Sequence, residues 1–171
     1  MWRVLVFALL PGCASSGPIS SAPPFIAGTP STLREVRVPA CCPLGWPVEA
    51  QVSSGFGVRE GKPHLGVDLV VPVGTPVLAA CDGIVRHADE TLRGYGRMVL
   101  VEHGDGLVTA YAHNERLLVA VGQAVTRGQP LALSGQTGRV TAPHVHFEVR
   151  VGGHAVDPLS FLEPRVHITT R

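Results

Sequence analysis

Short apolar runs separated by turns dominate the chain from Trp46 onward. None of these runs keeps a 3.6-residue apolar period over the length of a helix, and short runs bounded by turn residues are typical of strands. The 171 residues include 20 glycines and 15 prolines, which are the residues that most often mark turns. The pattern therefore predicts a mainly β domain, a compact antiparallel sheet that is barrel-like or sandwich-like. The expected strands cover residues 67–71, 76–80, 83–87, 97–102, 107–112, 130–134 and 144–151.

The N-terminal end of the chain predicts export. An apolar run that ends at Leu10 is too short to cross a bilayer, which needs roughly 20 residues, and is typical of a secretory signal. Together with Pro11-Gly12-Cys13 it resembles the bacterial lipobox, so residues 1–12 are a predicted lipoprotein signal peptide and Cys13 the lipidated membrane anchor. By the same analogy, Ala14 favours the periplasmic face of the outer membrane. The alternatives are an ordinary export signal, which leaves the protein in the periplasm or cell envelope, and a mis-assigned start codon.

Composition divides the rest of the chain into three parts. Residues 13–44 are rich in serine, proline and other small residues and sustain neither a helical nor a strand period. Such a segment predicts a flexible, disordered tether. Residues 45–163 carry the short apolar runs and form the predicted folded domain, and residues 164–171 form a C-terminal tail.

Charge and cysteine usage argue against two common kinds of site. The net charge is +1, Lys62 is the only lysine and the arginines are scattered singly. The sequence therefore lacks the basic patch or stripe that is typical of nucleic-acid binding. Cys41 and Cys42 are neighbours and no Cys-x-x-Cys spacing exists, which argues against a zinc ribbon. In an exported protein, either a disulfide from one of this pair to Cys81 or three free thiols are compatible with the sequence.

Three short segments concentrate the side chains that could carry chemistry. They are His64-Leu65-Gly66-Val67-Asp68, then His113 at the end of an expected strand, and then His144-Val145-His146. Because alternate residues of a strand share one face, His144 and His146 are expected to point the same way. Imidazoles and carboxylates are suitable zinc ligands. Each segment alone is compatible with solvated side chains, and strand geometry allows either His144 or His146 as a ligand.

Taken together, these segments resemble the lysostaphin/LytM-type zinc metallopeptidases, bacterial enzymes that cut peptide bonds in peptidoglycan. The pattern of that family is His-x-x-x-Asp, a later His at a strand end, and His-x-His, in this order. The resemblance covers residues 46–163 and implies a compact antiparallel β domain (the duplicated hybrid motif) with a groove across one sheet. The accompanying phrases are Trp46-Pro47-Val48, Ser54-Gly55-Phe56-Gly57-Val58-Arg59, Gly94-Tyr95-Gly96, Tyr111-Ala112-His113, Ser134-Gly135-Gln136-Thr137-Gly138, Pro143-His144-Val145-His146-Phe147-Glu148 and Asp157-Pro158.

The resemblance also implies roles for five residues. His64, Asp68 and His146 would hold one Zn²⁺ per domain, and His113 and His144 would be catalytic. Three protein ligands leave a fourth zinc position for water, as in other catalytic zinc sites. No His-Glu-x-x-His segment supplies a glutamate base, so the two catalytic histidines are the candidates for moving protons to and from a peptidoglycan peptide. How they divide this work stays open.

Two other functions compete with a peptidoglycan endopeptidase. Some relatives of this family have lost their metal ligands and activate cell-wall amidases, so a non-catalytic or weakly catalytic regulator is the first alternative. The glycine-rich residues 73–83 also have the appearance of a biotinyl or lipoyl carrier domain. Such carriers need a modified lysine at a hairpin tip, and the sequence suggests no such setting for Lys62.

The remaining polar residues have structural interpretations. Glu148 shares a strand face with His146 and is expected to orient that imidazole rather than act as a base. Arg59 is expected to pin a loop, with contact to substrate carboxylates as the alternative. Four further histidines fit no ligand spacing and are expected to be solvated: His87, His103, His154 and His167.

Overall fold

The computed structural model of the protein describes residues 43–59 and 61–165, and strands are the main secondary structure in this part of the chain. The named strands all pair antiparallel, and the 3-10 turn η1 (Pro158–Ser160) is the only helical element in these ranges. The predicted mainly β, antiparallel fold class is confirmed. The strands are β1 (Val52–Ser54), β2 (Gly57–Arg59), β3 (Lys62–His64), β4 (Val67–Leu69), β5 (Pro76–Leu78), β6 (Gly83–Asp89), β7 (Arg97–Glu102), β8 (Leu107–Leu117), β9 (Ala124–Val125), β10 (Pro130–Ser134), β11 (Val145–Val151) and β12 (His154–Val156).

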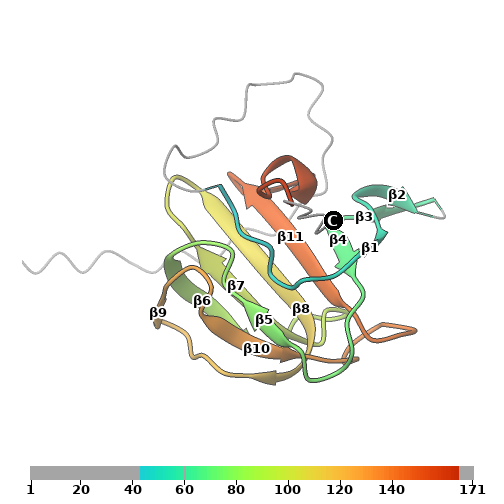
Figure 1. Ribbon diagram of the computed structural model, residues 1–171, viewed down its shortest axis with the longest axis horizontal. Coiled ribbons are helices and arrows are strands. Elements are labelled where there is room, and N and C mark those ends of the chain that lie inside the picture. Colours follow the sequence, from blue (N-terminus) through green and yellow to red (C-terminus); the bar gives the residue numbers. More distant parts are fainter. Residues whose placement is uncertain (1–42, 60, 166–171) are drawn as a thin grey trace, which may run out of the picture.

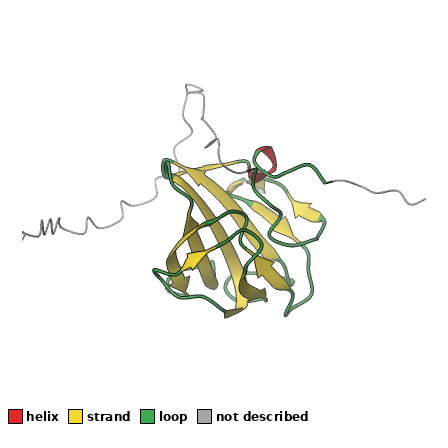
Figure 2. Ribbon diagram, turned by 60° about the vertical axis from the view of Figure 1, so that its left-hand side comes forward, coloured by secondary structure: helices red, strands yellow, loops and turns green. Residues whose placement is uncertain are grey.

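One curved sheet forms most of the domain. Its main path runs β1-β4-β11-β8-β7-β6-β9, while β12 pairs with β11 and the β5–β10 pair joins through β8. The first half of β8 lies between β7 and β11, and its second half, residues 114–117, pairs with β10. Figures 1 and 2 show the barrel-like shape that results, with the β2–β3 hairpin set to one side.

Alternation along the strands decides which side chains enter the apolar interior. On β11, Val145, Phe147 and Val149 are buried in the main core, and the Phe147 ring packs against Tyr111 with centroids 5.4 Å apart. Each such buried side chain contributes about 1.5–3 kcal/mol of hydrophobic stabilisation. The intervening residues point to the opposite side of the sheet, where they line a groove: His144, His146 and Glu148.

The strand bounds agree with the sequence pattern in some places and not in others. Strands β7 and β10 have the expected ends, whereas β8 continues to Leu117, so His113 lies within a strand rather than at its end. Strand β11 begins at Val145, and His144 precedes it in an isolated bridge to Gly135. The sequence pattern does not predict β1, β2, β3, β9 and β12, because each has only two or three residues, most of them exposed or half-buried, and none forms an apolar run.

Lys62 lies directly after the turn of the β2–β3 hairpin. The expectation that this lysine has no hairpin setting is therefore wrong. Its side chain lines the groove together with four histidines, so its surroundings differ from those of a solvent-facing carrier lysine.

Several predictions concern residues outside the described ranges. These are the signal peptide 1–12, the lipidation of Cys13, the tether and tail beyond residues 43–165, and His167. Cys81 is disulfide-bonded, and its partner lies outside the described residues, so the choice between Cys41 and Cys42 stays a prediction. The described part of the chain contains no helix long and apolar enough to span a membrane.

Candidate metal centre

Strand register places three of the candidate site residues next to one another. Asp68 of β4 pairs with His146 of β11, and His146 pairs on its other side with Ala112 of β8, directly before His113. A slip of one residue would turn every side chain of a strand to the opposite face. Because the apolar neighbours of Asp68 and His146 are buried in the core, such a slip is strongly unfavourable.

His64 reaches the same point from the β2–β3 hairpin. It ends β3, and the chain then bends at Gly66 before β4 begins. The backbone of Gly66 lies so close to β11 that a Cβ atom there would be 2.2 Å from the carbonyl oxygen of Phe147. Only glycine allows this approach, which brings His64 to the strand that carries His146.

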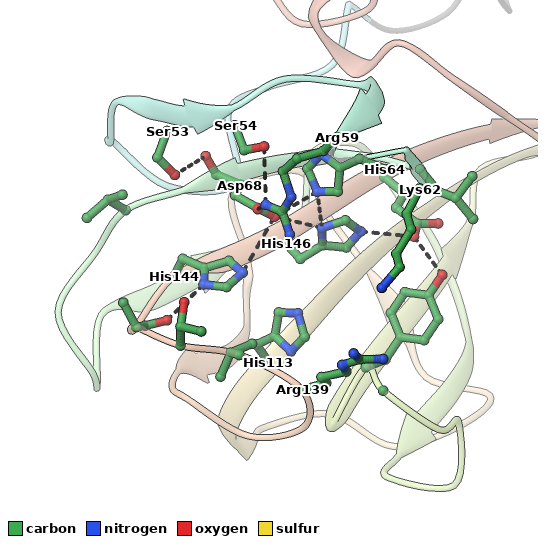
Figure 3. A pocket seen from close by; sticks show the side chains of 18 of the residues that line it. Ser53, Ser54, Arg59, Lys62, His64, Asp68, His113, Arg139, His144 and His146 are labelled. Atoms are coloured by element: carbon green, nitrogen blue, oxygen red, sulfur yellow. Dashed lines mark hydrogen bonds and ion pairs between the residues drawn. The ribbon is translucent and has the colours of Figure 1, made fainter.

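Three potential ligand atoms converge at the base of the groove (Figure 3). Asp68 Oδ1 lies 3.1 Å from His64 Nε2 and 2.8 Å from His146 Nδ1, and the two nitrogen atoms are 3.2 Å apart. In a tetrahedral zinc site with bonds of about 2.0–2.2 Å, ligand atoms are separated by about 3.3–3.6 Å. The observed triangle is slightly smaller than this.

Hydrogen bonds on the outer side of each ring direct lone pairs to the centre of the triangle. His64 Nδ1 donates to the carbonyl oxygen of Gly55 at 2.6 Å, and His146 Nε2 donates to the Glu148 carboxylate at 3.0 Å. In the neutral rings, His64 Nε2 and His146 Nδ1 therefore carry lone pairs that face the Asp68 oxygen, which can only accept. Three acceptors this close repel unless a cation lies between them, and two imidazoles with one carboxylate fit Zn²⁺.

The ionisation of these side chains leads to the same conclusion. Burial opposes ionisation of the Asp68 carboxyl, but the hydrogen bond and charge of His146, with His144 and His64 nearby, hold its pKa well below its usual range. Burial also disfavours the His146 imidazolium, yet hydrogen bonds to Asp68 and Glu148 raise its pKa to about 9 from its ordinary value of 6.5. The centre thus favours a positive charge, which a proton supplies when no metal is bound.

A bulge in β8 sets the position of His113. Val99 of β7 pairs with Tyr111 of β8, and Arg97 of β7 pairs with Asn114 of β8. Between these two pairs β7 has one residue and β8 has two, so β8 carries one extra residue here. His113 has a φ of 65°, in the left-handed region that costs a non-glycine residue about 1–3 kcal/mol. The Asn114 side chain secures the kink by donating to the carbonyls of Tyr111 at 2.8 Å and Arg97 at 2.9 Å. Bulges re-aim side chains, and this one aims His113 into the groove.

His113 and His144 face one another beside the three potential ligands, with ring centroids 4.8 Å apart. His113 Nδ1 donates to the carbonyl of Thr137, and His144 Nδ1 to that of Ala142, each at 2.9 Å. The neutral rings therefore carry their lone pairs on Nε2, and His144 Nε2 lies 3.5 Å from Asp68 Oδ1. Burial lowers the pKa of His113 to about 4, so this ring is neutral near pH 7.

The residues around this site match a known family. Residues 62–158, more than half of the chain, match the sequence profile of peptidase family M23. The chain belongs to peptidase family M23.

Curated relatives of this M23 chain are longer proteins. The murein hydrolase activator NlpD of Escherichia coli (strain K12) is 40% identical over 120 residues, which are 70% of this chain and 31% of that protein. The lipoprotein NlpD/LppB homolog of Pseudomonas aeruginosa is 40% identical over 148 residues, which are 86% of this chain and 46% of that protein. The chain therefore matches less than half of the length of either relative.

Solved structures of similar fold include peptidases. A zinc-containing peptidase from Vibrio cholerae is 38% identical with a TM-score of 0.62, over 67% of this chain and 38% of that one. The catalytic domain of lysostaphin from Staphylococcus simulans is 33% identical with a TM-score of 0.62, over 66% of this chain and 91% of that one. The resemblance to lysostaphin-type peptidases is confirmed.

Glu148 of the M23 domain makes the contact expected from the sequence and is fully buried. Besides His146, it accepts hydrogen bonds from Tyr95 Oη at 2.9 Å and from Arg150 Nε at 2.7 Å. Although burial opposes ionisation, the His146 hydrogen bond and the Arg150 charge keep its pKa below the usual range. Neither Tyr95 nor Arg150 was expected at this site from the sequence, although Tyr95 belongs to the Gly94-Tyr95-Gly96 phrase that the lysostaphin/LytM-type family shares.

The groove of the M23 domain is a cavity of about 780 Å³ whose rim carries cations. Arg59 Nη1 lies 3.1 Å from Asp68 Oδ2, which agrees with a structural role in holding the candidate ligand. The groove is also lined by Lys62, Arg93 and Arg139, which were not expected at the site because they belong to three segments that are separate along the chain.

Two of the histidines expected to be solvated, His87 and His103, are half-buried. His103 Nδ1 donates to the carbonyl of Asp82 at 2.6 Å, and its Nε2 accepts from the Thr109 hydroxyl at 2.7 Å, while burial lowers its pKa. The His87 side chain is only 17% exposed. His154 is exposed, as expected.

Proposed function

We propose that this chain is a zinc-dependent metalloendopeptidase that hydrolyses peptide bonds of peptidoglycan, in cross-links or stem peptides, during cell-wall remodelling. The observation that carries the proposal is the convergence of His64 Nε2, Asp68 Oδ1 and His146 Nδ1 at the base of an open groove, with His113 and His144 beside them. Membership of the M23 family and similarity to a zinc-containing peptidase support it.

In this proposal, His64, Asp68 and His146 hold one Zn²⁺, which when bound supplies polarisation of a peptide carbonyl and activation of water. Glu148 holds the His146 ring in the tautomer that presents Nδ1 to the centre. Arg59 holds the second oxygen of Asp68, which leaves Oδ1 directed at the centre.

His113 and His144 are the proton carriers of the proposed reaction. Each presents an Nε2 lone pair, since Nδ1 of each ring donates to a backbone carbonyl. Either ring is therefore able to accept a proton from the attacking water and to pass it to the amine that leaves. The two backbone carbonyls also fix the ring orientations, so neither histidine has to reorient during the reaction.

The second candidate function is a non-catalytic or weakly catalytic activator of cell-wall amidases. One observation favours it, namely the 40% identity to a protein named murein hydrolase activator NlpD. For either function we propose that Cys13 is lipidated and anchors the protein at the periplasmic face of the outer membrane, as the lipobox resemblance and a relative named as a lipoprotein suggest.

Digestion of defined, cross-linked peptidoglycan distinguishes the two functions. The purified, zinc-loaded protein is expected to release muropeptides that mass spectrometry identifies, and a chelator is expected to stop their release, because the proposed chemistry needs the metal. Restoring one equivalent of zinc should restore it. Absence of cleavage by the metal-loaded protein, together with stimulation of an added amidase, would establish the activator instead.

Zinc affinity is expected to rise by up to about tenfold per pH unit between pH 7 and 9, because zinc must displace a proton from His146, whose pKa is about 9. The raised pKa of His146 also affects stability. The proton on His146 stabilises the metal-free fold fully below its ordinary pKa of 6.5, and this stabilisation decreases above that pH and is lost as the pH rises through about 9. Competition with a chromophoric chelator across this range measures the affinity. An affinity that does not change with pH would contradict the assignment of His146 as a ligand.

A further inference from the structure

The groove beside the candidate metal centre gathers cations from separate segments. Lys62 comes from β3, Arg93 from the β6–β7 connection and Arg139 from the β10–β11 connection. In Figure 3, the side chains of Lys62 and Arg139 point toward one another at the end of the groove away from His144. The fold thus brings three positive charges into the lining of one groove, although they are scattered along the sequence.

These three cations differ from several other arginines on the surface. Among the described residues, none of the three forms a salt bridge, whereas other arginines pair with carboxylates: Arg86 with Glu102, Arg97 with Glu90 and Glu115, and Arg127 with Glu163. Two carboxylates line the groove, and both are already engaged. Asp68 contacts Arg59 and the histidines, and Glu148 contacts Arg150 and His146. The groove therefore has positive charge available for a ligand.

The backbones that carry Arg93 and Arg139 are tied together. The Arg139 N–H donates to the carbonyl of Gly94 at 2.9 Å. The two connections also pack so closely that a Cβ atom on Gly138 would lie 2.4 Å from the backbone nitrogen of Gly96. The two arginines consequently project from fixed positions, which lowers the entropic cost of binding a ligand between them.

We infer that Lys62, Arg93 and Arg139 form a subsite that binds a free carboxylate of the peptide substrate. This inference rests on the proposed function and specifies its substrate class: acidic peptides with a carboxylate near the scissile bond, in preference to neutral ones. Guanidinium and ammonium groups are the usual protein partners of carboxylates, through charge-assisted hydrogen bonds. Because the three side chains are exposed, each contributes modestly, and salt weakens the contribution.

Direct binding tests the subsite without relying on cleavage. The probe is a dye-labelled short peptide of alternating L and D residues with two free carboxylates, and its counterpart carries both as carboxamides. Fluorescence anisotropy compares the full-length protein with K62Q, R139Q and the K62Q/R139Q double variant. Arg116→Gln is the matched control, because it removes an exposed arginine that lies outside the groove.

The wild type is expected to bind the acidic peptide about tenfold more tightly than the carboxamide at low salt, and each single variant to lose about two- to fivefold of that preference. The double variant should lose nearly all of it and the Arg116→Gln variant none. Equal affinity of the wild type for both peptides, or an equal loss with Arg116→Gln, would overturn the inference. If the wild type prefers the acidic peptide but does not cleave peptidoglycan, the proposed peptidase is refuted and the subsite stands. If it cleaves peptidoglycan but binds both peptides equally, the subsite is refuted and the proposed peptidase stands.

Discussion

His146→Ala is expected to leave the protein without zinc and to lower peptidoglycan cleavage by about a thousandfold or more. The change removes the nitrogen that lies 2.8 Å from Asp68 Oδ1 and 3.2 Å from His64 Nε2. With only two ligands left, the site no longer holds the metal that supplies several kcal/mol of transition-state stabilisation, and each 1.36 kcal/mol corresponds to tenfold in rate. Metal analysis of the purified protein and muropeptide release measure the two effects.

Loss of folding is the competing explanation for such a result. His146 lies between two buried carboxylates, and its removal leaves them without their shared partner. His64→Ala therefore serves as the second variant, because His64 belongs to the β2–β3 hairpin outside the central sheet. It should lose zinc and cleavage to a similar extent while circular dichroism stays unchanged. The exposed His154 provides the matched control, and His154→Ala should keep both properties. Full zinc content in a folded His146→Ala protein would contradict the ligand assignment.

Removal of either proton carrier is expected to have a different signature. His113→Ala and His144→Ala should retain about one zinc per chain and lower kcat by about a hundredfold to ten-thousandfold, the range typical of general acid–base groups. The contrast between His144→Ala and His146→Ala tests the division of the His-x-His pair directly, since the two residues lie on the same side of the sheet. Zinc content and kcat measured on the same preparations separate metal loss from loss of proton transfer.

His113 needs a second variant because of its backbone. Its φ of 65° is a conformation that asparagine tolerates better than alanine does. His113→Asn should therefore fold like the wild type and still lose cleavage, since an amide does not accept a proton near neutral pH. If this variant cleaved at the wild-type rate, His113 would be structural, and His144 would remain the only proton carrier of the proposal.

The sequence predicted the parts of the fold that depend on local alternation. Strands β7 and β10 have the expected ends because each is an apolar run bounded by turn residues. The extension of β8 past His113 was not predictable, since the strand continues only through a bulge, which the Asn114 side chain stabilises by hydrogen bonds to the carbonyls of Tyr111 in β8 and Arg97 in β7. The β2–β3 hairpin was likewise missed, because its pairing depends on register and turn geometry rather than on buried residues.

For the site, the sequence alone determined which kinds of side chain are present and which of them share a strand face. His144 and His146 alternate with buried residues, so their common direction followed from a period of two. Only the tertiary structure decided that His146 Nδ1, rather than His144 Nε2, lies nearest to Asp68 Oδ1, at 2.8 Å against 3.5 Å. It also decided that Lys62, Arg93 and Arg139 line the same groove. The physical reason is that such distances depend on the register, bending and close packing of segments far apart in the chain, which no local pattern records.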